Sequence, residues 1–279
     1  MMDKVVRIGG ASGFWGDSSV GAPQLVAKGQ VDYLVFDYLA ELTMSILAAA
    51  RAKDPELGYA TDFVAVTLKG ILKDVAAQGI RVISNAGGVN PQACARAIAA
   101  LAAEQGVDIK IAVVLGDDAT ALVPELRGED VRELQSGAAM PAKLLTANAY
   151  LGALPVKQAL DAGAQIVVTG RCVDSAVTLG ALMHEFGWAA DDWDRLAQGS
   201  LPGQSGTSSQ SVCRPPVAWQ PHSMMWPARL PWARRSQSSA AQPNSCISAP
   251  SVTALSTQRP VTTIWAPCRS SRRWTRAPR

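Results

Sequence analysis

The chain has 279 residues, enough for one large domain or two small ones, and its 48% of hydrophobic residues suffices for a sizeable core. Its formal net charge is +3. Because it has no apolar run of transmembrane length and no signal-peptide pattern, we expect a cytoplasmic protein without a membrane partner. Its five cysteines are irregularly spaced, it has no Cys-x-x-Cys pair and it has only two histidines, which argues against a disulfide framework and against a Cys/His zinc site.

Short apolar runs alternate with amphipathic stretches over residues 1–200, which is typical of βαβ units and a parallel sheet. The expected strands are 5–8, 33–36, 81–84, 110–115 and 165–168. The expected helices are 42–52, 63–78, 91–105, 156–162 and one from about 175 to about 185, and 120–142 is an irregular excursion. Gly79 and Gly106 are expected to cap helix C-termini. The predicted fold is α/β, a mainly parallel sheet flanked by helices in Rossmann-like layers.

The composition changes near residue 200. Residues 1–200 hold 16 Lys and Arg against all 23 Asp and Glu, whereas residues 201–279 hold ten Arg and no Lys, Asp or Glu. The second part also holds five of the eight Trp and eleven of the 17 Pro. Folded domains balance their charges and use Gly at turns, yet no Gly follows Gly206. We therefore predict an incomplete α/β domain at 1–200 and an irregular tail at 201–279.

Three explanations of the tail are open. It can be a basic arm that binds nucleic acid through interleaved Arg and Trp, or a disordered extension. It can also be the translation of a GC-rich gene in a wrong reading frame, which yields Arg, Pro, Ser, Ala and Trp with few acids. We favour the third explanation, because a basic arm normally uses Lys as well and five exposed Trp are costly. Nucleic acid is therefore not an expected partner.

Polar, Gly-rich segments follow the predicted strands, and parallel α/β sheets bind ligands at those strand ends. The candidate anion- or ligand-binding residues are Gly10, Ser12, Asn85, Gly87, Gly88, Asn90 and Arg171, and the candidate catalytic residues are Asp37, Asp117 and Asp174. The glycines at 10, 13 and 16 can approach a phosphate or can simply form a tight turn. Residues 85–91 lead into a helix N-terminus and can form an anion nest, although turn chemistry explains their glycines equally well.

Arg171 is the strongest single candidate, because an Arg that follows an apolar strand can clamp a carboxylate or a phosphate. The alternative is a salt bridge between Arg171 and Asp174. Asp117 and Asp118 can bind a cation or act as acid and base. Adjacent side chains on extended backbone point in opposite directions, so we expect at most one of the two to face the site. His184 is expected to pack or to cap a helix rather than to catalyse.

Several segments together resemble the acyclic terpene utilisation (AtuA-like) family, formerly a domain of unknown function. They are residues 7–17, 32–37, 85–91, 116–118, 147–153, 169–174, 184–188 and 191–193, and their order and spacing fit along residues 4–200. The resemblance implies a role in bacterial breakdown of acyclic terpenes such as citronellol and geraniol. It implies an enzyme or enzyme subunit that acts on a branched terpenoid acid or acyl-CoA, with no cofactor assigned. The alternative is a non-catalytic accessory subunit of an acyl-CoA carboxylase or hydratase assembly.

The resemblance stops near the point where the composition changes. Residues 201–219 lack the Gly-His, Glu-Cys and Thr-Gly-Gly motifs with which the family continues. GC-rich codons chosen for residues 205–218 restore those motifs when they are read two bases on. We therefore expect a frameshifted tail in place of the family's downstream segment, and an inactive truncated product is a further alternative for the function.

Overall fold

The structure is a computed structural model that describes residues 4–205, 210–213, 251–256 and 259–264. Its strands are β1 (Val6–Ser12), β2 (Tyr33–Phe36), β3 (Arg81–Ser84), β4 (Lys110–Leu115), β5 (Ile166–Thr169), β6 (Gln210–Cys213), β7 (Ser251–Ser256) and β8 (Arg259–Ile264). Its α-helices are α1 (Gly21–Lys28), α2 (Glu41–Lys53), α3 (Lys69–Gln78), α4 (Pro91–Gln105), α5 (Val123–Gly128), α6 (Leu154–Asp161), α7 (Ala176–Phe186) and α8 (Trp193–Ser205). A π-helix, η1 (Phe63–Leu68), precedes α3, and a 3₁₀-helix, η2 (Thr120–Leu122), precedes α5.

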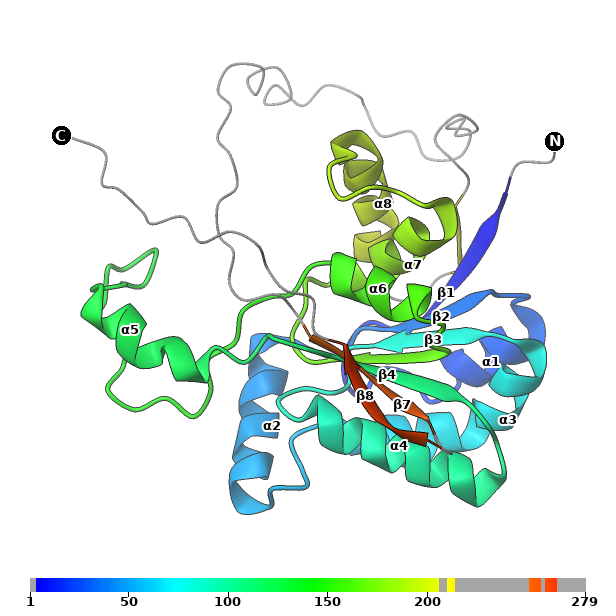
Figure 1. Cartoon of the computed structure of the whole chain (residues 1–279), viewed down its shortest axis with the longest axis horizontal. Helices are drawn as coiled ribbons and strands as arrows, with labels where there is room; N and C mark the ends of the chain where they lie inside the picture. Colours follow the sequence, from blue (N-terminus) through cyan, green and yellow to red (C-terminus); the bar gives the residue numbers. More distant parts are fainter. Residues whose placement is uncertain (1–3, 206–209, 214–250, 257–258, 265–279) are drawn as a thin grey trace.

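Five parallel strands form the centre of one sheet, in the order β1-β2-β3-β5-β4. Helices flank this sheet on both sides (Figure 1). The α/β fold with a mainly parallel sheet that the sequence predicts is therefore confirmed. No helix among the described residues is long and apolar enough to cross a membrane.

Three segments of the tail, which the sequence predicts to be irregular, form strands of the sheet. Strand β6 pairs antiparallel with β1, β7 pairs antiparallel with β4, and β8 pairs antiparallel with β7. The edges of β1 and β4 offer unpaired backbone groups to a further strand, and β-branched residues such as Val252 and Thr253 favour strand conformation. Helix α8 also runs to Ser205, five residues past the predicted domain boundary. The rest of the tail, with the segment whose reading frame is in question, lies outside the described residues.

The core lies in two layers, one on each face of the sheet. On one face, Leu34, Val82 and Ile111 pack with apolar residues of α1, α3 and α4. On the other face, Val35 and Ile83 pack with apolar residues of α6 and α7, and α8 adds a partly buried leucine. Strand residues are thus apolar on both sides, as expected for a parallel sheet with both faces covered.

Two helices around the sheet end at a glycine, and one of them begins at an asparagine. Gly79 and Gly106 adopt left-handed φ angles of 69° and 67° and cap α3 and α4, as the sequence predicts. Asn90 caps the N-terminus of α4, where its side chain accepts a hydrogen bond from the N–H of Ala93, and Pro91 follows at the first position of the helix.

Helix α2 lies apart from the two main layers. Its buried residues are Met44, Leu47 and Ala48, and the first two form a small cluster of their own with Leu39. The opposite side of the helix is exposed, with Leu42 73% accessible. Figure 1 shows α2 projecting beyond the sheet near the start of α4.

The order of the strands creates a crevice at their carboxyl ends. Strands β3 and β5 are neighbours, but the helices that follow them, α4 and α7, lie on opposite faces of the sheet. The two loops therefore leave the sheet in opposite directions, which is the arrangement at which α/β proteins bind ligands.

Candidate functional site

The loops after the strands meet at the carboxyl edge of the sheet. The N–H of Gly87, after β3, donates to the carbonyl of Thr169 in β5 over 3.1 Å. The N–H of Asp37, after β2, donates to the carbonyl of Ser12 in β1 over 3.0 Å. The segments that carry the predicted site residues are therefore neighbours in space.

Asp37, which is half-buried, and Asn85 form a polar pair between the ends of β2 and β3. Asn85 is fully buried; its Nδ2 donates to Asp37 Oδ1 over 2.6 Å, and its Oδ1 accepts the N–H of Tyr38 over 2.7 Å. Burial raises the pKa of Asp37 to about 6 against the effect of the Asn85 hydrogen bond, and the nearby carboxylate of Asp174 adds to the increase. The Asp37 carboxyl group thus stays protonated to a higher pH than an ordinary aspartate.

Arg171 follows β5 and is 4% exposed. Its Nη1 donates to the carbonyls of Leu39 and Cys172 and to Asp174 Oδ1, each over 3.1 Å. The Arg171–Asp174 salt bridge that the sequence offered as the alternative is therefore present. The guanidinium joins the loops after β2 and β5.

Tyr150 covers Arg171 on its outer side. The Cζ atom of Arg171 lies 4.0 Å from the centre of the Tyr150 ring, which is a close cation–π contact. The hydroxyl of Tyr150 donates to Glu41, whose carboxylate also lies 3.5 Å from Arg171 Nη2. These contacts surround Arg171 with protein groups and hold α2 against the loop after β5.

The backbone N–H groups of residues 86–90, in the loop after β3, donate hydrogen bonds to acceptors of the protein itself. The N–H of Ala86 donates to Ser84 Oγ. The next four N–H groups donate to backbone carbonyls: Gly87 to Thr169, Gly88 to Asn85, Val89 to Gly58, and Asn90 to Gly87. A Cβ on Gly87 would lie 2.5 Å from the Thr169 carbonyl oxygen, and one on Gly88 would lie 2.6 Å from that of Gly58. Close packing of backbone against backbone therefore accounts for both glycines, as the turn explanation proposed.

Asn90 also holds a second loop. Its Nδ2 donates to the carbonyls of Pro55 and Leu57, each over 2.8 Å, while its Oδ1 caps α4. Asn90 thus ties the loop that follows α2 to the start of α4.

The loop after β1 is closed by its own side chains. Ser12 Oγ donates to the carbonyl of Phe14 over 2.8 Å, and Asp17 accepts the N–H of Gly13 over 3.0 Å. Gly10 is buried within β1. Gly13 and Gly16 thus lie in a tight turn, the second of the two interpretations given for this segment, whereas Gly10 belongs to the strand.

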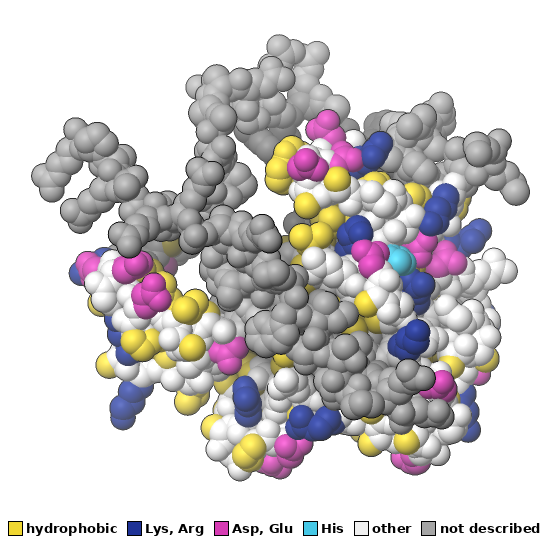
Figure 2. Space-filling view, viewed as in Figure 1, with side chains coloured by type: hydrophobic (Ala, Val, Ile, Leu, Met, Phe, Trp, Pro, Cys, Tyr) yellow, Lys and Arg dark blue, Asp and Glu magenta, His cyan; other side chains and the backbone are white. Residues whose placement is uncertain are grey.

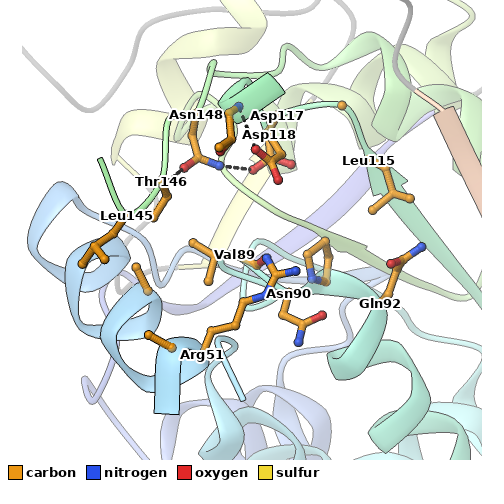
Figure 3. A pocket seen from close by; sticks show the side chains of 15 residues that line it. Arg51, Val89, Asn90, Gln92, Leu115, Asp117, Asp118, Leu145, Thr146 and Asn148 are labelled. Carbon is orange, nitrogen blue, oxygen red and sulfur yellow. Dashed lines mark hydrogen bonds between the residues drawn. The ribbon is translucent and has the colours of Figure 1, made fainter. Parts of the chain in front are cut away.

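A pocket of about 410 Å³ opens beside these loops. Its wall is formed by α2, by the residues between Val89 and Gln92 after β3, by the end of β4 and by residues 145–148. Figure 3 shows Asp117 and Asp118 on one side and Arg51 on the opposite side. Of the predicted site residues, Asp117 and Asn90 line this pocket, and the Asp37–Arg171 group lies next to it behind Asp117.

Asp117 is 4% exposed and is fixed by two donors. Its Oδ2 accepts the N–H of Arg171 over 2.8 Å and Nδ2 of Asn148 over 3.0 Å. Gly170 makes this possible, because a Cβ there would lie 2.7 Å from Asp117 Cγ. Burial raises the pKa of Asp117 against the two hydrogen bonds.

The expectation that at most one of the neighbouring aspartates faces the site is wrong, since both Asp117 and Asp118 line the pocket. The alternation of an extended strand ends before them, where Gly116 adopts a φ of +119°. The two still differ: Asp117 is buried, whereas Asp118 is exposed and accepts the N–H of Thr120 over 2.9 Å.

Arg51 is a pocket residue that the sequence pattern did not single out, whereas Asn148, which also lines the pocket, belongs to a polar segment noted in the sequence. Arg51 lies on α2, and its Nη1 donates to the carbonyl of Val89 over 2.6 Å. In the sequence it looks like any other charge near a helix C-terminus. Asn148 lies in a family-like segment, 147–153, and its Oδ1 accepts the hydroxyl of Thr146.

His184 belongs to a separate polar cluster at the other end of the strands. Its Nδ1 lies 2.6 Å from Asp161 Oδ1, and its Nε2 lies 2.6 Å from Arg81 Nη1. The described part of the chain contains no group of three or more His, Cys, Asp or Glu side chains arranged to hold a metal ion.

Comparison with known proteins agrees with the motifs noted in the sequence. The chain matches the model of the family described as acyclic terpene utilisation family protein AtuA over residues 6–210. No curated protein and no solved structure matches the chain. The family match includes all five parallel strands and every predicted site residue. The chain is therefore a member of the acyclic terpene utilisation family AtuA.

Proposed function

We propose that the chain is an enzyme of acyclic terpenoid breakdown whose pocket binds a branched acid or its acyl-CoA, and that Asp117 transfers a proton to or from the bound ligand. The observation that carries this proposal is the buried Asp117 carboxyl group in the wall of a 410 Å³ pocket at the crevice of the sheet. Pockets for small molecules occupy roughly 300–1,000 Å³.

The surroundings of Asp117 suit acid–base chemistry. Oδ2 is held by the N–H of Arg171 and by Asn148, so it serves as a fixed acceptor and Oδ1 is the oxygen that carries an exchangeable proton. Burial raises the pKa of this carboxyl group above that of an ordinary aspartate, and a raised carboxyl pKa favours general acid–base chemistry. Arg171 and Asn148 are then positioning residues, because they act through Asp117.

The walls of the pocket divide into an apolar and a polar part. Ala48, Val89, Leu115 and Leu145 supply apolar surface that suits a branched hydrocarbon chain. Asp117 and the polar groups near it lie across from α2 (Figure 3). A short branched acyl group therefore fits the pocket in size and in chemistry.

Exchange with solvent deuterium tests the proposed proton transfer even though the complete reaction is not established. Geranic acid and its CoA thioester are incubated with the full chain in D₂O, and deuterium in the recovered ligand is measured by mass spectrometry. We expect the wild type to introduce deuterium and Asp117→Asn to bind the same ligand without exchange. Asp74→Asn, an exposed aspartate on α3, is the matched control and should exchange as the wild type does.

Two results would overturn this role. One is a wild type that binds a ligand without any exchange, and the other is exchange by Asp117→Asn at the wild-type rate.

A second candidate function is that of a non-catalytic subunit, and exposed hydrophobic residues favour it. Leu134 is 97% exposed and Leu145 is 76% exposed, both on the segment that carries α5. Figure 2 shows hydrophobic side chains over this arm. Contiguous exposed apolar surface marks sites of protein association. Recovery of an acyl-CoA carboxylase or hydratase with the tagged chain, lost on Leu134→Asp, would support this function, because Leu134 does not line the pocket.

A further inference from the structure

We propose that Arg51 is a carboxylate-binding residue, so that the pocket selects a branched acid with a free carboxylate over the corresponding alcohol. This inference rests on the proposed ligand pocket and names the ligand class that it takes. It does not depend on the proton transfer by Asp117.

Arg51 is an exposed residue of α2 whose side chain is held at two points. A Cβ on Gly58 would lie 2.9 Å from Arg51 Cβ and 3.3 Å from its Cδ, so the stem of Arg51 packs closely against this glycine. Gly58 has a φ of +102°, a conformation that other residues adopt rarely. At the other end of the side chain, Nη1 donates to the carbonyl of Val89 over 2.6 Å.

The residues that hold Arg51 are themselves tied to the loop after β3. The N–H of Val89 donates to the carbonyl of Gly58 over 2.9 Å, and Asn90 binds the carbonyls of Pro55 and Leu57. The loop that the sequence offered as an anion nest therefore positions a cationic side chain at the pocket. A guanidinium held in this way loses little conformational entropy when it binds a ligand.

Arg51 differs from neighbouring arginines in its charge partners. Arg96 pairs with Glu56 over 2.8 Å, and Arg171 pairs with Asp174 over 3.1 Å. Within the described part of the chain, Arg51 makes no ion pair with a carboxylate at up to 4.0 Å. An arginine fork binds a carboxylate through two parallel hydrogen bonds, so Arg51 can take a ligand carboxylate in this way.

The opposite side of the pocket would repel an anion. Asp118 is exposed there and lies beside Asp117 (Figure 3). A bound carboxylate therefore belongs at the α2 side, with Arg51. The hydrocarbon chain then extends past Leu115 towards Asp117, where a proton can be transferred.

The test compares the affinities of geranic acid, geraniol and free coenzyme A for the full chain by calorimetry. The acid and the alcohol share one hydrocarbon chain, so their affinity ratio isolates the carboxylate, and coenzyme A tests phosphate as the alternative anion. We expect the wild type to prefer the acid by about tenfold or more, the range of a charge-assisted hydrogen bond. Arg51→Gln should reduce this ratio to about one, and Arg51→Lys should give an intermediate ratio because it keeps the charge without the fork.

Lys53→Gln is the matched control, since Lys53 is an exposed cation on the same helix that does not line the pocket. It should keep the wild-type ratio. Equal affinities of the wild type for acid and alcohol, an unchanged ratio in Arg51→Gln, or tighter binding of coenzyme A than of the acid would each overturn the inference. Acid selectivity through Arg51 together with a failed deuterium exchange would refute the function of Asp117 alone.

Discussion

Alanine at Gly170 would place a methyl group against the carboxyl group of Asp117. The Cβ would lie 2.6 Å from Oδ1 and 2.7 Å from Cγ of Asp117, well inside van der Waals contact, and closer still to Oδ2. Asp117 cannot retreat without losing the N–H of Arg171 or the amide of Asn148. The substitution therefore tests whether the buried carboxyl group sits as tightly as the structure shows.

The expected cost follows from two effects. Forcing a methyl group into a well-packed site costs roughly 1–3 kcal/mol. A buried polar group that loses its hydrogen bonds costs roughly 1–3 kcal/mol more. We expect Gly170→Ala to lower the free energy of unfolding by about 3 kcal/mol, a large part of the 5–15 kcal/mol typical of a folded domain.

Urea unfolding followed by circular dichroism measures this difference, with Gly70→Ala as the matched control. Gly70 lies inside α3 with open space around its Cα, so the same change should raise the free energy of unfolding by about 0.5–1 kcal/mol. Opposite signs for the two substitutions are the expected result. A Gly170→Ala chain as stable as the wild type would refute the packing described for Asp117.

Three further predictions concern the polar groups around the pocket. Burial raises the pKa of Asp37 from 3.8 to about 6, so ionisation of this carboxyl group opposes folding, and the free energy of unfolding falls as pH rises from about 4 to about 6. Asp37→Asn should therefore be more stable than the wild type at pH 8. Urea titrations should show that this difference is gone below about pH 4. Asn148→Ala removes a hydrogen bond that lowers the pKa of Asp117 and should move the midpoint of the pH profile of deuterium exchange upwards; an unchanged midpoint would contradict its positioning role. Arg171→Ala leaves two buried carbonyl groups unpaired and should cost about 3 kcal/mol in thermal or urea unfolding, whereas unchanged stability would show that Arg171 is not structural.

The central strands and one long helix could be predicted from the sequence to the residue. Residues 33–36, 81–84 and 110–115 are β2, β3 and β4, and residues 91–105 are α4, as expected. These strands are buried on both faces and therefore appear as apolar runs. Pro91 and Gly106 mark the two ends of the helix.

Other elements were missed or placed less accurately. Helix α1 has only eight residues, and its apolar stripe is limited to Ala22, Leu25 and Val26, which is too short for a clear helical period in the sequence. Residues 63–78 form a π-helix and then an α-helix, and the first residue, Phe63, packs edge-on against Phe36 and Tyr38, contacts that the local sequence does not encode. Strand β1 continues four residues beyond its predicted end, through glycines that were interpreted as a turn.

The candidate site shows the same division between local and long-range information. Asp117 was predicted because it directly follows an apolar strand. Arg51 was not, because its role depends on Gly58 and on Val89, which lies 38 positions away in the chain. The predicted role of Arg171 as an anion clamp rested on its position after β5, but the sequence does not reveal the carbonyl groups that surround it. Those contacts arise only when the loops meet at the edge of the sheet.

A crystal structure of the chain with geranic acid would show directly whether the pocket binds a branched acid in the proposed orientation. We predict the carboxylate within hydrogen-bond distance of the Arg51 guanidinium and the hydrocarbon chain along Leu115, with Asp117 beside it. A ligand bound elsewhere, or bound at Arg171 after displacement of Tyr150, would contradict both the proposed pocket and the role of Arg51.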